Sequence, residues 1–167
     1  MATMIILSIL LVVSFMGIII WRTKELPESV SAMVYALPTG GWQWMWTIWL
    51  LLVDVFTFAP AIGILDVQGF GWLAFLPMAM IGFVAVWPLF DEEHRAWHYA
   101  LSIAAAIVTQ LCVWKIFPWC LLLWLLLLIL CIYAFFAKSY PSWLKGKSVL
   151  IAECICYLTL VLAEILY

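Results

Sequence analysis

Residues 117–137 read FPWCLLLWLLLLILCIYAFFA, a run of 21 residues without one charged side chain. A bilayer core about 30 Å thick is crossed by a helix of roughly 17–25 apolar residues. In water so apolar a helix would expose much of its surface, whereas in lipid that exposure carries no cost. The run therefore predicts a transmembrane helix.

Five more runs of comparable length and character flank this one. The six expected spans are residues 4–21, 42–62, 70–90, 97–114, 117–137 and 149–167. The 167-residue chain is 69% hydrophobic and 10% charged, whereas soluble domains are about 45–50% apolar and about 25% charged. We therefore expect an all-α fold, a polytopic membrane helix bundle of about six transmembrane helices, with residues 1–167 forming a single domain.

Composition also argues against several classes of protein. The formal net charge is −2 and no basic patch is present, so we expect no nucleic-acid partner. All five cysteines lie inside apolar runs and none forms a C-x-x-C pair, which argues against a disulfide framework or a zinc ribbon. The residues before the first run, Met1-Ala2-Thr3, lack the positive charge of a signal peptide, so we expect that run to be retained as a helix.

The distribution of basic residues predicts the orientation, because cytoplasmic loops are enriched in lysine and arginine. The first, third and fifth connections hold six of them: Arg22, Lys24, Arg95, Lys138, Lys145 and Lys147. The second and fourth connections hold only Lys115. We therefore expect a multi-pass protein of the bacterial inner membrane with both termini outside. Its expected partners are membrane lipids, with self-association or another membrane protein as further candidates.

Ionisable side chains inside a membrane are costly, and each one marks a candidate site. Four fall within the expected spans: Asp54, His98, Glu153 and Glu164. Asp54 lies roughly 18 Å deep at 1.5 Å per residue, and Gln110 lies at a similar depth in another span. The two are therefore candidates for a hydrogen-bonded pair, which Thr57 and Thr109 would extend into a short polar pathway. The alternative is a protonated Asp54 that makes one structural hydrogen bond.

The most polar stretch, residues 91–98, contains His94 and His98. Because they are four residues apart, they share one face of a helix and are candidate ligands of a zinc ion. Glu153 is the first candidate for a third ligand, and Asp91 the second. The alternatives are a solvated His94 with His98 at the lipid headgroups, or a proton relay through histidine, whose ordinary pKa is about 6.5.

The first connection provides a second polar stretch. Ser29 follows Pro27 and Glu28 and can cap a short amphipathic helix that contains Ser31. Under the expected topology this helix lies on the same side of the membrane as His98. The sequence therefore predicts that two distant polar stretches converge at one membrane face, although polar loops must lie on one side or the other in any case.

Residues 27–35 (PESVSAMVY) and 93–102 (EHRAWHYALS) resemble an uncharacterised family of small multi-span proteins from gut bacteria and their phages. In that family a similar Pro-Glu-Ser-x-Ser element follows the first helix, and a His-Tyr element opens a later one. The resemblance implies a family but no established activity.

The chain is also similar to the membrane hydrolase superfamily of alkaline ceramidases and progestin and adiponectin receptors. Those proteins combine a serine, an aspartate and an H-x-x-x-H pair around zinc within seven spans. The similarity implies corresponding roles for Ser31, Asp54, His94 and His98. Here, however, six spans are expected, and the histidine pair lies in the middle of the chain rather than in the last helix.

Three functions follow as alternatives, and the sequence leaves open whether the protein is an enzyme. The first is a non-enzymatic small transporter, channel-like protein or lipid-binding module that uses the polar side chains within the spans. The second is a zinc-dependent hydrolase of a lipid amide or ester at the cytoplasmic interface. The third is a structural subunit of a membrane complex. We favour the first, because no nucleophile elbow or zincin motif is present.

Overall fold

The structure is a computed structural model that describes residues 1–38, 42–86, 95–137 and 146–167. Within these ranges every regular element is a helix, which confirms the predicted all-α class. In chain order the elements are α1 (Ala2–Thr23), η1 (Ser31–Ala36), α2 (Gln43–Asp66), α3 (Gly71–Ala85), α4 (Arg95–Ile116), η4 (Pro118–Leu123), α5 (Trp124–Ala137) and α6 (Ser148–Leu166). The two η elements are 3₁₀ helices.

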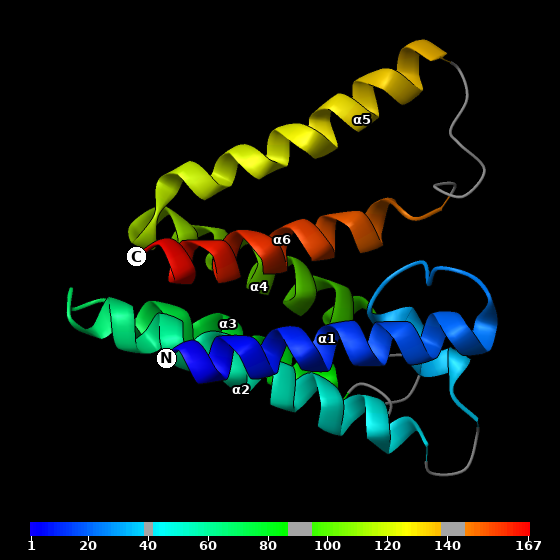
Figure 1. Ribbon diagram of the computed structural model, residues 1–167, viewed down its shortest axis with the longest axis horizontal. Coiled ribbons are helices and arrows are strands. Elements are labelled where there is room, and N and C mark those ends of the chain that lie inside the picture. The colour runs from blue at the N-terminus through cyan, green and yellow to red at the C-terminus, as the bar shows by residue number, and fades with distance from the viewer. Residues whose placement is uncertain (39–41, 87–94, 138–145) are drawn as a thin grey trace.

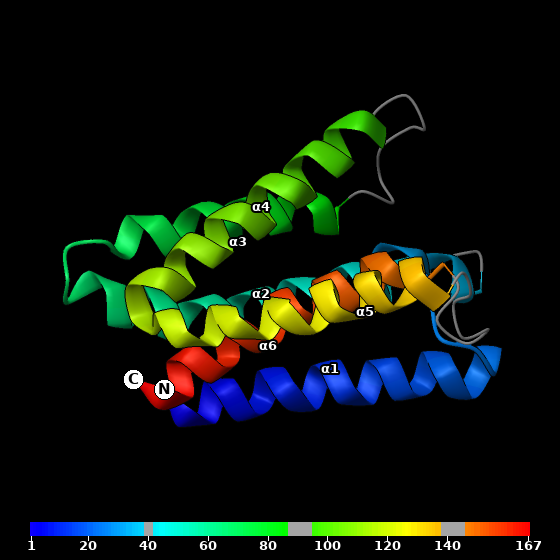
Figure 2. The same cartoon turned by 90° about the horizontal axis from the view of Figure 1, so that it is seen from above.

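The helices run roughly along the long axis of the molecule, and both termini lie at the same end (Figures 1 and 2). Helices that follow one another in the chain pack together, since α2 contacts both α1 and α3, and α3 contacts α4. The last helix, α6, closes the bundle against α4 and α2. Helix α5 makes its main contacts with η4 and α6 and diverges from α6 along its length (Figure 1).

Four of the described helices are long and apolar enough to cross a membrane: α1, α2, residues 96–116 of α4, and α6. The other two expected spans correspond to shorter apolar helices. Helix α3 has 15 residues and ends at Ala85, and residues 87–94 lie outside the described ranges. The structure therefore fits a membrane protein with four full-length spans, and a count of six stays a prediction.

The fifth expected span differs from the continuous helix that the sequence suggested. It begins as the 3₁₀ helix η4 and becomes α-helical at Trp124. Pro118 lies at the start of η4, directly after a single linking residue, Phe117, at the end of α4. Proline has no N–H to donate and restricts the residue before it, so the chain cannot continue as a regular helix here. Helix α4 and η4 are therefore joined by a tight turn.

Local sequence also explains two other connections. Helix α1 ends at Thr23, and the C-cap residue Lys24 has the left-handed φ of 61° and donates its N–H to the carbonyl of Ile20. Between α2 and α3, Gly69 has φ of 77°, a conformation that costs glycine little. A Cβ at Gly71 would lie 2.9 Å from a carboxylate oxygen of Asp66, so the close approach of these two helices requires a glycine.

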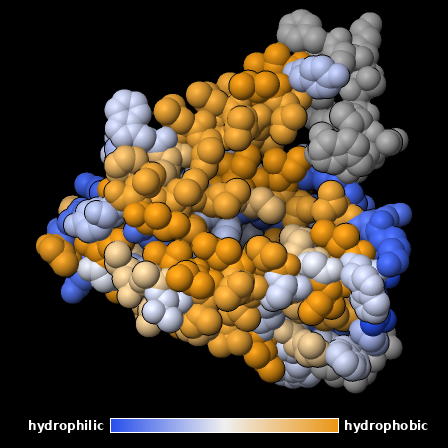
Figure 3. All heavy atoms as spheres, in the orientation of Figure 1, coloured by the Kyte–Doolittle hydropathy of each residue, from blue (hydrophilic) through white to orange (hydrophobic). Residues whose placement is uncertain are grey.

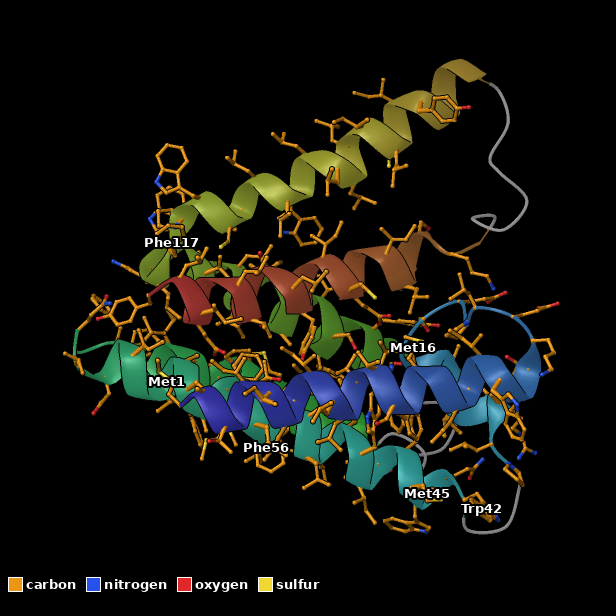
Figure 4. All side chains as sticks on the ribbon, viewed as in Figure 1. Met1, Met16, Trp42, Met45, Phe56 and Phe117 are labelled. Carbon is orange, nitrogen blue, oxygen red and sulfur yellow. The ribbon has the colours of Figure 1, made fainter. Side chains whose placement is uncertain are left out.

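The buried apolar residues form two clusters along the bundle. One surrounds η1 and includes Met33, Trp46 and Leu150. The other lies toward the end that holds the termini and includes Leu65 and Leu160. Figure 4 shows the same two ends, with Trp42 and Met45 near the first and Met1 and Phe117 near the second.

The face of the molecule seen in Figure 3 is apolar over its middle. Hydrophobic residues cover the centre of the face shown in Figure 3, and hydrophilic residues gather toward its two ends. On α5, Leu126 and Ile129 are each more than half exposed. Such a surface fits immersion in lipid, where exposed leucine and isoleucine carry no penalty.

Candidate functional site

The short helix η1 is bound to α4 through a pair of side chains. Ser31 lies at the start of η1, and its hydroxyl Oγ is 2.9 Å from Nε2 of His98, near the start of α4. His98 is buried and Ser31 is half-buried. A hydroxyl that is hydrogen bonded to an imidazole nitrogen has the arrangement from which histidine can accept the hydroxyl proton.

The backbone beside Ser31 is bound to two further helices. Val30 donates its N–H to Oε2 of Glu153 on α6, at 2.6 Å. The carbonyl of Val30 accepts the indole N–H of Trp46 on α2, at 3.0 Å, and Trp46 is completely buried. In addition, Leu150 donates its N–H to the carbonyl of Glu28 at 3.1 Å. Segment 28–37 is therefore held against α2, α4 and α6 at once.

These contacts confirm that the first connection converges with the start of α4. They also place Glu153 beside the same segment. Ser29 Oγ accepts the N–H of Ala32 at 3.0 Å, although the N-cap residue of η1 is Val30 rather than the predicted Ser29. What chemistry this cluster performs stays a prediction. His94 and Asp91 lie outside the described residues.

The described residues alone do not provide a zinc site. They contain no group of three histidine, cysteine, aspartate or glutamate side chains placed to hold a metal ion. Nε2 of His98 is bonded to Ser31, and Oε2 of Glu153 is bonded to the N–H of Val30. The zinc prediction therefore depends on His94, and it gains no support from the described part of the chain.

A second polar cluster lies within the bundle, where it joins three helices. Ser8 Oγ on α1 lies 2.6 Å from Thr57 Oγ1 on α2 and 2.9 Å from the hydroxyl of Tyr157 on α6. Ser8 and Thr57 are both buried. Because lipid offers no alternative partner, a hydroxyl inside a membrane bundle stabilises the packing of the helices that it joins. We call Ser8, Thr57 and Tyr157 the hydroxyl triad.

Two buried carboxyl groups lie near this triad along the same helices. Asp54, which is 4% exposed, is three residues before Thr57 on α2. Glu164, which is 1% exposed, is seven residues after Tyr157 on α6. Residues three, four or seven apart lie on one helix face. Each carboxyl therefore lies on the face that carries a triad hydroxyl.

Neither carboxyl is fully satisfied by the described residues. Oδ1 of Asp54 and both carboxyl oxygens of Glu164 are buried and make no hydrogen bond. The N–H of Ala61, one residue after Pro60, lies close to Glu164. A buried carboxyl group without a full set of partners is costly at such a position, so both groups are candidates for binding a ligand or an ion.

The predicted pair of Asp54 and Gln110 does not form. Gln110 instead accepts hydrogen bonds at Oε1 from the indole of Trp124 and from the hydroxyl of Thr159, at 2.8 and 3.1 Å. Its amide donates to the sulfur of Cys156 at 3.1 Å. Gln110 therefore links α4 to α5 and α6 rather than to α2. Thr109, the other member of the expected pathway on α4, donates to the carbonyl of Ala105 in its own helix.

Sequence reasoning overlooked two members of the hydroxyl triad. Ser8 and Tyr157 lie inside apolar runs, where neither residue interrupts the hydrophobic pattern. The available signal is chemical, because a serine within a membrane span needs a hydrogen-bond partner in its own or a neighbouring helix.

Comparisons of this chain with known proteins identify no similar protein. The chain matches no protein-family model, and no curated protein or solved structure shows significant similarity to it.

Proposed function

We propose that the protein is a non-enzymatic, multi-pass membrane protein of the small transporter or channel-like class. One observation carries the proposal: the hydroxyl triad joins α1, α2 and α6 within the bundle, between two buried carboxyl groups. Apolar side chains would pack these helices at lower cost, so polar groups retained at this depth favour a role in binding or passage.

The proposed arrangement in the membrane has six crossings, with both termini outside. It is supported by the predominance of basic residues in the odd-numbered connections. The position of the two termini at one end of the molecule agrees with an even number of crossings (Figures 1 and 2).

The test is the permeability of liposomes that contain the purified full-length chain. Three probes are measured in parallel: potassium ions, protons and glycerol. We expect at least one of them to cross faster than in protein-free liposomes, and a Thr57→Val variant to alter that rate. Ser14→Ala is the matched control, because Ser14 is an exposed hydroxyl residue on α1. Equal permeability to all three probes with and without protein would overturn the proposal.

A hydrolase at the membrane interface is the second candidate, and the Ser31–His98 hydrogen bond favours it. In this reaction Ser31 Oγ would bond to the acyl carbon of a lipid ester, while Nε2 of His98 accepts the hydroxyl proton. His98 would return that proton to the departing alcohol, and water would then release the acyl group.

Covalent labelling separates this candidate from the first. A fluorophosphonate probe should label the wild-type protein and fail to label Ser31→Ala, while Ser29→Ala, which changes a nearby serine, keeps its label. Absence of labelling in a folded sample would reject a serine nucleophile. Metal analysis of wild type beside His98→Ala tests the zinc prediction separately, since a bound zinc ion should be present in the first sample and lost in the second.

A further inference from the structure

A set of polar side chains follows one face of α6 through much of the bundle. Glu153, Tyr157 and Glu164 occupy positions i, i+4 and i+11 of this helix, which place them on one side. Eleven residues of α-helix span about 16 Å, roughly half of a bilayer core about 30 Å thick. Glu153 lies at the η1 end, the hydroxyl triad lies between, and Glu164 lies toward the termini.

Helix α2 provides a matching set across the interface. Asp54, Thr57 and Ala61 lie at i, i+3 and i+7. Thr57 is linked to Tyr157 through Ser8, and Ala61 lies beside the carboxyl of Glu164. The two helices therefore face each other through polar groups at two successive levels of the bundle.

We propose that the ion transported through the bundle is the proton. Asp54 and Glu164 are its binding groups, and the hydroxyl triad relays it between the helices. The proposal rests on the proposed transport function and names the transported species. A metal cation would need several oxygen ligands converging on one point. Asp54 and Glu164 instead lie at separate levels of the bundle, with Oδ1 of Asp54 unsatisfied and only the N–H of Ala61 beside Glu164, and a proton is the cation that one isolated carboxyl can hold by itself.

Each transfer balances without any further reactant. A hydroxyl oxygen of the relay accepts a proton and releases its own proton to the next acceptor, so each hydroxyl regains its original charge. Water completes the steps between groups that are not in direct contact. Among the described residues, Cys112 on α4 and Tyr157 on α6 lie within electrostatic range of Glu164, and Cys154 and Cys156 lie near Glu153.

The experiment measures proton entry into liposomes that contain the full-length protein and the pH-sensitive dye pyranine. A potassium gradient with valinomycin drives the protons inward. Wild type should acidify the interior, and Asp54→Asn and Glu164→Gln should each slow acidification by roughly a factor of ten. Asparagine and glutamine replace the neutral acids at nearly equal volume, so both variants should fold.

The chain offers close controls for each substitution. Asp66→Asn makes the same chemical change at an exposed position of the same helix as Asp54, and Glu25→Gln does so for an exposed glutamate. Both should leave proton entry unchanged. Tyr157→Phe keeps the ring and both carboxyls but removes a relay hydroxyl, so it should slow entry as well.

The outcomes separate this inference from the proposed function. Unchanged proton entry in both Asp54→Asn and Glu164→Gln would overturn the assignment of the binding groups. If potassium or glycerol crosses the liposome membrane and protons do not, the protein is not a proton transporter, but the proposed transport function is retained. If the protein makes the liposomes permeable to none of the probes, both proposals are wrong.

Discussion

Ser8 on α1 and Tyr157 on α6 are 149 positions apart in the sequence, and their side-chain oxygens lie 2.9 Å apart. The same Ser8 oxygen is bonded to Thr57, so one small side chain connects the first, second and last helices. In a protein whose helices are apolar on almost every side, such bonds fix which faces meet, because lipid-facing and buried leucines are energetically similar.

Replacing Ser8 with alanine should therefore loosen the bundle. The change removes two hydrogen bonds and leaves Thr57 and Tyr157 to find other partners, so we expect a loss of about 1–2 kcal/mol in the free energy of unfolding. Unfolding of the detergent-solubilised protein by added SDS measures it. Ser14→Ala removes an exposed serine from the same helix and should cost much less. Equal losses in the two variants would contradict the structural role of Ser8.

Trp46→Phe should weaken the attachment of segment 28–37 to α2. The phenylalanine ring can occupy most of the buried site, but it cannot donate to the carbonyl of Val30. We expect a cost of about 1–3 kcal/mol, the usual penalty for a buried acceptor left without its donor. Trp44→Phe is the matched control, because Trp44 is exposed on the same helix. A stability equal to that of wild type would show that the indole hydrogen bond is dispensable.

Glu153→Leu should release the same segment from α6. It removes the acceptor of the Val30 N–H, and hydrogen–deuterium exchange of peptides covering residues 28–37 should then become faster. Glu153→Gln keeps an acceptor oxygen and should have a smaller effect. The exposed Glu28→Gln serves as a surface control. Exchange that is equally slow in wild type and Glu153→Leu would argue against this attachment.

Reporter fusions test the proposed orientation. Alkaline phosphatase fused to the carboxyl end should be active, because that enzyme folds only outside the cytoplasm, and a green fluorescent protein fusion at the same place should stay dark. The expectation follows from the excess of arginine and lysine in the odd-numbered connections. The reverse pattern would place Ser31 and His98 on the outer face.

Sequence reasoning located one cluster and missed the details of the other. The first cluster consists of residues in or beside polar connections: Ser31, His98 and Glu153. Connections that lie on the same side of the membrane in a small bundle are necessarily close to one another. Their meeting was therefore predictable, although the hydrogen bond between Ser31 and His98 was not.

The failure of the Asp54–Gln110 pair has a physical reason. Depth in the membrane follows from counting residues, but the direction in which a side chain points depends on the rotation of its helix. Helix α4 has apolar residues on most sides, so its pattern does not show which face meets α2. The structure turns Gln110 toward α5 and α6, where Trp124 and Thr159 donate to it.

The bond between Val30 and Glu153 also bears on how the protein is made. Its two partners are separated by 123 positions, so during synthesis the Val30 N–H cannot form this hydrogen bond until α6 has been synthesised. Until then segment 28–37 lacks one of its hydrogen bonds to the bundle, and we expect it to be more accessible to proteases. A chain arrested before α6 should accordingly be short-lived in cells, and pulse-chase labelling of a product ending at residue 147 would show its decay.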